Sequence, residues 1–380
     1  MPFTGKATYS GGASLPEISE DVSDLVSINS AHETPLLDAL GDPSRVARST
    51  VHEWLEDTLL PTRSTVTTAT TPTAPVVADP ARFRVGDTIR FEGASEIALV
   101  TGVNIDTGVL TLERGYGNTT TTTLAAGRVI HIIGNAAIEG AAAGDARFTV
   151  RSRQSNFTQI FSATASVSGS EMAVNQIGVR DELAWQKNLR TRELLRDLEN
   201  SVINGVANGD APEGSTTTRR TMRGIISAIA TNRFVVGQNS FPSNTALTEA
   251  QLNQALRSMW ATSSGTVDMI LVGGREKRAI NQFVATNRQF YNSNESYKDM
   301  VSVYESDFGV CRVVLSRHVP VGAVLLLDSS RISVMPLAGR NFHYSALART
   351  GDAESGQIIG EYTVEFRNES AHGLISGFTQ

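Results

Sequence analysis

One long helical pattern constrains the fold most, because no other segment of the chain matches it in length. From Asn175 to Asn204, apolar residues recur at helical spacing and charges of both signs fill the positions between them. Asn204-Gly205 and Asn208-Gly209 predict the end of this helix. A helix of about thirty residues is far longer than the globular mean. No second helix of comparable length is expected, so a helical bundle is disfavoured. The pattern instead favours a single spine helix that packs against a sheet.

The segments around this helix predict an α+β fold with mixed sheets and no regular βαβ alternation. Thr248-Glu-Ala-Gln251 has the form of a capping box and predicts a helix that begins there. A second, short helix is expected over 276–283, and a hairpin turn at Asp307-Phe-Gly309. The expected strands of this part of the chain are 156–167, 269–272, 300–304, 310–315, 324–327, 332–335 and 358–366.

The segment between the N-terminal region and the long helix predicts an extended excursion with a small barrel inserted in it. Seven threonines lie between Thr62 and Thr73, and together with nearby prolines they favour extended or irregular chain. Four short strand patterns separated by glycine turns then predict a small β-barrel of the OB or SH3 kind over 82–135. The residues on both sides, 51–60 and 146–150, also look extended.

The first fifty residues contain little apolar material of their own. Residues 1–14 are polar, and Ile18, Val22 and Leu25 form only a short stripe at helical spacing. Thr34-Pro35 predicts the start of a short helix that Gly41 ends. This composition fits an N-terminal subdomain and fits equally an arm that lies on another subunit.

Composition excludes several classes of protein. The chain has 380 residues, a formal net charge of −6 and one cysteine, Cys311. Its length predicts two or more lobes or a large insertion, and its charge does not suit a surface that grips a polyanion. A single cysteine excludes an internal disulfide framework and any site with several cysteine ligands. No apolar run is long enough for a membrane span, and no secretory signal is recognisable.

Motifs of catalysis are almost absent. No nucleophile elbow, no phosphate-binding glycine-lysine loop and no histidine pair suited to zinc occurs. Ser316, His318 and Asp328 lie close in sequence, but such clusters arise often by chance and do not predict a triad. Cys311 lies among valines, which predicts a buried, unreactive thiol. We therefore expect a protein that is not an enzyme, with no catalytic, cofactor-binding or metal-binding residues.

The order of these parts resembles the major capsid protein of tailed bacteriophages. The stretches that carry the resemblance are Glu33-Thr-Pro-Leu-Leu-Asp-Ala-Leu-Gly41, Arg147 to Ser168, Glu182-Leu-Ala-Trp-Gln186 with Glu193 to Glu199, Ser302 to Gly309, and Val324 to Asp328. The resemblance implies an N-arm (1–48), an E-loop (49–81 and 136–172) that carries the inserted barrel (82–135), a peripheral domain with the spine helix (173–210 and 341–380), and an axial domain (211–340). It covers nearly the whole chain except the insertion.

The implied function is structural: copies of the chain would tile an icosahedral shell around phage DNA. The implied partners are further copies in hexamers and pentamers, a scaffolding protein, a portal complex and a cement or decoration protein. Packaged double-stranded DNA would be held only loosely, and no membrane is involved. The implied location is the virion, after assembly in the host cytoplasm. A bacterial surface or fibre-type structural protein is the alternative, which the threonine tracts would also suit.

Two further expectations concern covalent chemistry. Some capsids of this fold join subunits through an isopeptide bond that needs a lysine on the E-loop. This chain has no lysine from residue 49 to 172, and arginine does not replace lysine as a nucleophile. We expect a shell held by non-covalent contacts. Because the arm-like region begins within some thirty residues of Met1, we also expect maturation without cleavage of a leading scaffold segment.

Overall fold

The chain forms two compact units connected by a two-stranded ribbon. The computed structural model describes residues 33–43, 45–60, 62–69, 71–140, 142, 146–174, 181–263, 265–287, 303–349 and 351–379. One unit comprises residues 1–54 with 153–380, and the other comprises residues 55–152. The chain passes from one unit to the other in β1 (Val51–Glu56) and returns in β8 (Ser152–Phe157), and these two strands pair with each other.

A six-stranded mixed sheet forms one half of the larger unit. Its strand order is β10, β18, β14, β11, β13, β12, with the bounds β10 Arg233–Val235, β18 Gly373–Ser376, β14 Ala323–Leu327, β11 Met269–Val272, β13 Gly309–Leu315 and β12 Val303–Ser306. Every residue of β11 is buried, because Met269 and Leu271 belong to one hydrophobic core and Ile270 and Val272 to another. Both faces of this sheet are therefore covered, which explains why its central strands read as unbroken apolar runs.

The second core lies between the six-stranded sheet and the helices α5 (Glu249–Thr262) and α6 (Gly274–Asn287). Leu252, Leu256 and Met259 of α5 and Ile280 of α6 pack there. Thr248 caps α5 through the predicted capping box, in which its side chain and that of Gln251 each reach the other's backbone. The remaining short helices of this unit are α2 Gly169–Ala173, α4 Ile225–Ala228, and the 3₁₀ turns η3 Ser329–Arg331 and η4 Glu369–Ala371.

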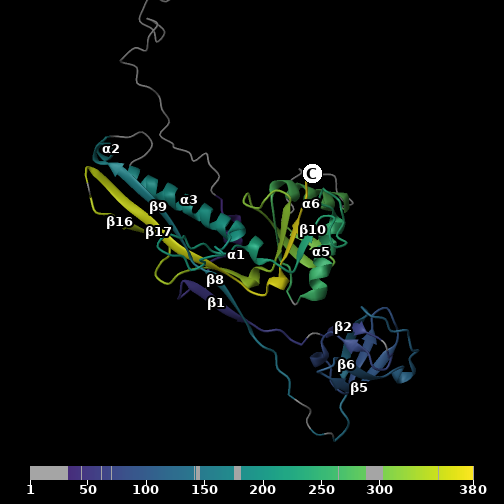
Figure 1. Ribbon diagram of the computed structural model, residues 1–380. Helices are drawn as coiled ribbons and strands as arrows, with labels where there is room; N and C mark the ends of the chain where they lie inside the picture. Colours follow the sequence, from purple (N-terminus) through teal and green to yellow (C-terminus); the bar gives the residue numbers. More distant parts are fainter. Residues whose placement is uncertain are drawn as a thin grey trace, which may run out of the picture. The chain divides into compact units, whose positions relative to one another are not determined.

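The first core lies between this sheet and a second one, along which the longest described helix runs. The strand β17 (Ala353–Phe366) pairs with β9 (Gln159–Ser168), with β16 (His343–Ala346) and with β15 (Ile332–Pro336), always antiparallel. The helix α3 (Glu182–Asn204) lies beside β9 and β17 (Figure 1). Its buried residues follow one stripe, and most of them join this core: Leu194, Leu198, Val202 and Ile203.

Several predictions for the larger unit are confirmed. The strand that contains 362–366 pairs beside the long helix, across more than 150 residues of sequence, as expected. The hairpin of β12 and β13 also forms. The predicted helix 175–204 is described only from residue 182, because 175–180 lie outside the described residues, as do 300–302 of the expected strand 300–304.

The predicted mixed character of the sheet is confirmed. β11 pairs in parallel with β13 and antiparallel with β14, and α6 and β12 lie between β11 and β13 in the chain. The expected helix 276–283 is part of this crossover and extends over Gly274–Asn287. Parallel partners need such a crossover connection, because the chain must return to the same end of the sheet before the second strand begins. The expected strand at 146–150 is absent as well, since these described residues have no ladder partner.

The described part of the predicted arm packs on its own chain. The helix α1 (Pro35–Leu40) inserts Leu36, which is fully buried, into the first core. Ala47 forms a parallel bridge with Leu337. That residues 1–48 also lie on another subunit stays a prediction, because the described residues belong to a single copy of the chain. The expected stripe Ile18, Val22 and Leu25 lies outside the described residues.

The smaller unit is a closed six-stranded barrel, as the glycine-separated strand patterns predicted. Its strand order is β2, β3, β6, β5, β4, β7, and the ring closes between β7 and β2, with the bounds β2 Arg63–Thr68, β3 Val76–Val77, β4 Asp87–Phe91, β5 Ile97–Asn104, β6 Val109–Glu113 and β7 Val129–Asn135. Two short 3₁₀ turns, η1 Pro80–Arg82 and η2 Tyr116–Asn118, complete the unit. Its interior is a separate apolar core that includes Phe91, Ile89 and Ile130.

The barrel begins earlier than the predicted 82–135. The threonine-rich run supplies β2, in which Ser64 and Val66 point inward while Thr65 and Thr67 face solvent. Threonine is a good strand residue because its branched side chain fits a pleated surface. The run was predicted to be extended or irregular, and the strand was not recognised because the buried position at Ser64 is polar, like the threonines around it, and because prolines lie close by.

A buried ion pair fixes one loop of the barrel. Glu96 is fully buried and receives hydrogen bonds from Arg114 Nη2 at 2.6 Å and from the Thr122 amide at 2.6 Å. Arg114 also lies over the Phe91 ring, 5.2 Å from its centroid. Burial raises the pKa of Glu96, but the hydrogen bonds from Arg114 and Thr122 outweigh it and bring the pKa to about 2. The ionised carboxylate therefore holds the loop between β6 and β7 against the end of β5.

We predict that Glu96→Gln destabilises the barrel by about 3 kcal/mol, because it leaves the buried Arg114 without its counter-charge. In the native protein, the stability that the ionised Glu96 contributes is lost as the pH falls from 4.5 towards 2. The reason is that the pKa of Glu96 is about 2 in the folded state and has its ordinary value of 4.5 in the unfolded state. Thermal unfolding of residues 55–152, followed by circular dichroism from pH 2 to pH 7, measures both effects. Glu92→Gln on the exposed side is the control, and equal melting of the two variants would contradict the prediction.

Candidate assembly site

Ser316, His318 and Asp328 lie close together in sequence, but Ser316 and Asp328 are far apart in the structure. Ser316 follows β13, and its amide donates to the carbonyl of Val272 at one end of β11. Asp328 follows β14 beside Met269, at the other end of β11. These ends are about 10 Å apart along the strand. The Ser316 hydroxyl donates to Glu199 Oε1 at 2.9 Å and does not contact a histidine ring. Ser316, His318 and Asp328 therefore do not form a triad.

Cys311 is a buried thiol of the core, as its position among valines predicted. The thiol donates to the Val267 carbonyl, and burial raises the pKa of Cys311 to about 11. A thiol with this pKa is protonated at neutral pH and a poor nucleophile. Among the described residues, no group of three His, Cys, Asp or Glu side chains could hold a metal ion. No helix in the described part of the chain has the length and apolar character that membrane crossing requires.

The most unusual feature of the larger unit is a row of buried polar residues on β17. Tyr362, Val364 and Phe366 face the first hydrophobic core. The alternate residues, Glu361, Thr363 and Glu365, face the opposite side and are nonetheless at most 3% exposed. Buried carboxylates need partners, because removing an ionised group from water without one is very unfavourable. We call these three residues the β17 polar row.

Glu361 connects three segments of the chain. Its Oε1 accepts hydrogen bonds from the Thr158 hydroxyl at 2.6 Å and from Arg220 Nη2 at 2.5 Å. Its Oε2 forms an ion pair with Arg340 Nε at 2.8 Å. Arg220 also donates to the Thr158 carbonyl at 2.6 Å. The loop before α4, the start of β9 and the turn after β15 are therefore held at one carboxylate.

Glu365 performs the same role for the N-terminal segment. Arg45 Nη2 donates to its Oε1 at 2.9 Å, and Arg367 Nε lies 3.2 Å from the same oxygen. His52 Nε2, on β1, lies 2.8 Å from Oε2. The segment that leads from α1 into β1 is thus attached to β17 through side chains rather than through a strand ladder.

The return strand β8 is attached in a similar way. The Asn156 amide donates to the Val364 carbonyl at 2.7 Å and to the Arg223 carbonyl at 2.9 Å. The Thr363 hydroxyl donates to the Phe157 carbonyl at 3.0 Å. The ribbon of β1 and β8 is a separate two-stranded sheet, so these contacts and those of Glu365 fix its base to the larger unit. The β17 polar row is the joint at which the chain leaves this unit and returns to it.

A second buried carboxylate joint lies on α3. Glu199 is fully buried; its Oε2 accepts from the amides of Leu36 and Leu37 at 3.2 and 3.4 Å, and its Oε1 accepts from Ser316. Burial raises the pKa of Glu199, since none of its hydrogen-bond partners carries a positive charge. This residue attaches α1 to α3.

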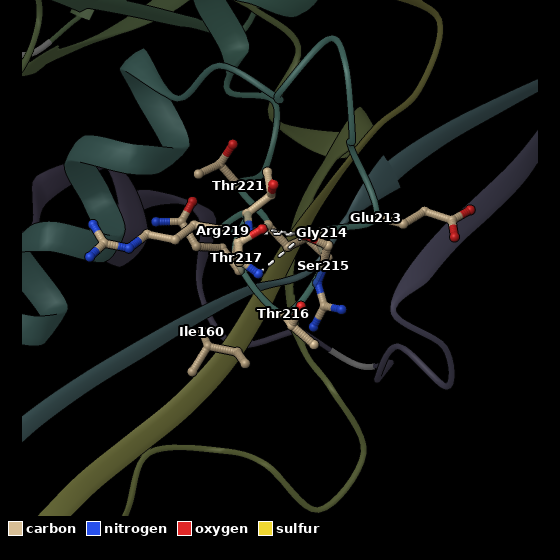
Figure 2. A pocket seen from close by; sticks show the side chains of 11 residues that line it. Ile160, Glu213, Gly214, Ser215, Thr216, Thr217, Arg219 and Thr221 are labelled. Carbon is tan, nitrogen blue, oxygen red and sulfur yellow. Dashed lines mark hydrogen bonds between the residues drawn. The ribbon is translucent and has the colours of Figure 1, made fainter.

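An open pocket adjoins the β17 polar row. The loop 213–221 lines it together with Gln159 and Ile160 of β9, and its volume is about 720 Å³ (Figure 2). The Ser215 hydroxyl folds the loop by accepting the amides of Thr217 and Thr218 at 3.2 and 3.0 Å. The lining is rich in hydroxyl groups and contains no nucleophile paired with a base.

These features agree with what the chain is similar to. Residues 3–379 match the family described as SU10 major capsid protein. The chain belongs to this family. Its role is that of a structural capsid protein. A search of curated proteins found no match.

Solved capsid structures share the fold over almost the whole chain. The capsid of cyanophage A-1(L) is 14% identical with a TM-score of 0.57, and the match covers 96% of this chain and 98% of that one. The capsid of Myoviridae phage XM1 is 10% identical with a TM-score of 0.52, covering 97% and 99%. The capsid of a native GTA particle is 9% identical with a TM-score of 0.52, covering 99% and 100%. At these identities the likeness establishes the tailed-phage capsid fold alone, which is the fold expected from the order of segments.

The sequence did not reveal the joint residues. The sequence predicts a strand over 358–366, but its pattern does not indicate that Thr363 and Glu365 are buried. Their burial depends on Arg45, Arg220 and Arg340, which are more than one hundred residues apart from one another in the chain. The available signal was weak: two glutamates, Glu361 and Glu365, lie four residues apart on one face of the strand, among mainly apolar and small neighbours within 358–366.

We predict that Glu361→Gln destabilises the larger unit by about 3 kcal/mol, because Arg220 and Arg340 lose their counter-charge in a water-poor site. Glu354→Gln on the same strand is the matched control, since the Arg349–Glu354 pair is mostly exposed and contributes less than about 1 kcal/mol. All three tryptophans, Trp54, Trp185 and Trp260, lie in the larger unit, so tryptophan fluorescence in urea reports on it alone. Indistinguishable midpoints for the two variants would refute the joint.

Glu199→Gln is expected to behave in the opposite way. The amide oxygen can still accept from α1 and the amide nitrogen can donate to Ser316, while the unfavourable buried charge is gone. Because burial raises the folded-state pKa of Glu199, the native protein loses stability as the pH rises above 4.5, and the variant avoids this loss. The variant should melt at or above the native temperature at pH 8, with the difference vanishing below pH 4.5. A variant that melts lower at pH 8 would show that the charge itself is needed.

Proposed function

We propose that this protein is the major building block of an icosahedral phage head that encloses double-stranded DNA. The observation that carries the proposal is the family match over residues 3–379, together with capsid folds that align over nearly the full length of both chains. The net charge of −6 supports loose contact with packaged DNA. The same match argues against the bacterial surface or fibre-type alternative, and a structural family argues against an enzyme.

In this proposal each part of the chain has a role in the lattice. Residues 1–48 act as the N-arm, 49–81 and 136–172 as the E-loop, 173–210 and 341–380 as the peripheral domain, and 211–340 as the axial domain. The barrel, here residues 63–135, is carried by the E-loop. The β17 polar row lies at the base of the E-loop, where its charge-assisted hydrogen bonds attach β1 and β8 to the larger unit.

The partners follow from the same role. Copies of the chain associate as hexamers and pentamers, and a scaffolding protein, a portal complex and a cement or decoration protein complete the head. Assembly takes place in the host cytoplasm, and the mature location is the virion. Many weak contacts repeated across a closed lattice support a stable shell without strong pairwise affinity.

We predict that the concentrated, purified protein forms shells or ring-shaped capsomers in negative-stain electron microscopy. A stable monodisperse monomer, with or without the co-expressed scaffolding protein, would refute the proposal. Because no lysine occurs from 49 to 172, particles boiled in detergent with reductant should release one band near 40.7 kDa. Ladders of larger covalent species would contradict the non-covalent shell and leave the capsid role standing.

A further inference from the structure

Two Asn-Gly sequences follow each other at the end of α3, and the structure holds them very differently. They are Asn204-Gly205 and Asn208-Gly209, the only two in the chain. In such a sequence the glycine amide nitrogen can attack the asparagine side-chain carbonyl carbon, because glycine has no side chain to obstruct the approach. Reaction requires a backbone that can bend into this geometry and an amide nitrogen that is not engaged elsewhere.

Asn204-Gly205 is locked in place. The Gly205 amide donates to the Ser201 carbonyl at 2.8 Å and closes the last turn of α3. The Asn204 side-chain amide donates to Asn200 Oδ1 at 2.8 Å and to the His318 carbonyl at 2.7 Å. The Cβ that an alanine would have at position 205 would lie 2.3 Å from the Ser201 carbonyl oxygen, so the backbone has no room to move there.

Asn208-Gly209 lies in an open loop with the opposite properties. Gly209 is exposed, and a Cβ at this position would meet no atom within 4 Å. Among the described residues, nothing accepts a hydrogen bond from the Gly209 amide or from the Asn208 side-chain nitrogen. The Asp210 amide donates to Asn208 Oδ1 at 3.1 Å. This hydrogen bond draws electron density from the side-chain carbonyl and makes its carbon more electrophilic.

We propose that Asn208 is a site of spontaneous covalent modification, at which the assembled or free protein converts asparagine to aspartate and isoaspartate. The Gly209 nitrogen forms a bond to Asn208 Cγ and loses its proton, and the side-chain nitrogen leaves as ammonia, which gives a five-membered succinimide. Water then adds to one of the two ring carbonyls and opens the ring. No enzyme, oxidant or reductant takes part. The proposal does not depend on the capsid role.

The modification changes a loop that reaches the β17 polar row. The loop runs from the end of α3 to Arg220, which binds Glu361. Each event adds one negative charge close in sequence to Asp210 and Glu213, and the isoaspartate product also lengthens the main chain by one carbon. The protein therefore acquires charge heterogeneity with age at one defined position of its surface.

The test is peptide mapping by mass spectrometry of the native full-length protein, kept folded at pH 8 and sampled over days. Deamidation adds about one mass unit to the peptide and separates it from its parent in chromatography. We expect conversion at Asn208 to be at least about tenfold faster than at Asn204, because three hydrogen bonds must open before Asn204 can react. In the urea-unfolded protein, the two rates should become similar.

Gly209→Ala provides the matched variant. An alanine at 209 meets open space, so the variant should fold with an unchanged melting temperature, while its methyl group slows the attack on Asn208 about tenfold or more. Equal rates at Asn204 and Asn208 in the folded protein would overturn the proposal. So would an Asn208 that stays intact in the folded protein while it reacts in the unfolded one.

Discussion

Glu361 and Glu365 can be buried on β17 only because cations from distant parts of the chain reach them, since an ionised carboxylate that loses its water without a partner is unfavourable by several kcal/mol. Arg45, Arg220 and Arg340 supply those charges from three separate segments. The buried position of β17 and the placement of the segment after α1, of the loop before α4 and of the turn after β15 therefore depend on the same few ion pairs.

The two kinds of buried carboxylate have different consequences. Those of the β17 polar row have arginine side chains and hydrogen-bond donors as partners, and such charge-assisted hydrogen bonds are directional as well as attractive. Glu199 has only neutral donors, and its burial works against the charged form. The β17 polar row fixes the base of the β1–β8 ribbon. Glu199 attaches α1, and the stability of that attachment depends on pH. Apolar side chains in place of the β17 polar row or of Glu199 would bury a comparable area. They would not specify which segments of the chain pair with each other.

The sequence was informative where a pattern is local and repeated. The stripe of α3, the capping box at Thr248 and the glycine-separated strands of the barrel were all recognisable, and the order of segments led to the correct fold. It was uninformative where position depends on tertiary contacts. A serine at the buried position 64 hid the alternation of β2, and the burial of Glu365 depends on its contacts with Arg45 and His52. The four-residue apolar run of β11 likewise does not reveal that its partners are β13 in parallel and β14 antiparallel.

The barrel has a property that follows from its closure. Its first and last strands, β2 and β7, are neighbours in the ring, with Ser64 paired to Ile130. The chain consequently enters and leaves at adjacent positions, and a closed ring offers no free strand edge to a neighbouring molecule. A module with neighbouring ends can be exchanged for another without disturbing the ribbon that carries it, as domain insertions elsewhere require. The position of the barrel is therefore suited to the insertion of a foreign domain, which every copy of the subunit would then carry.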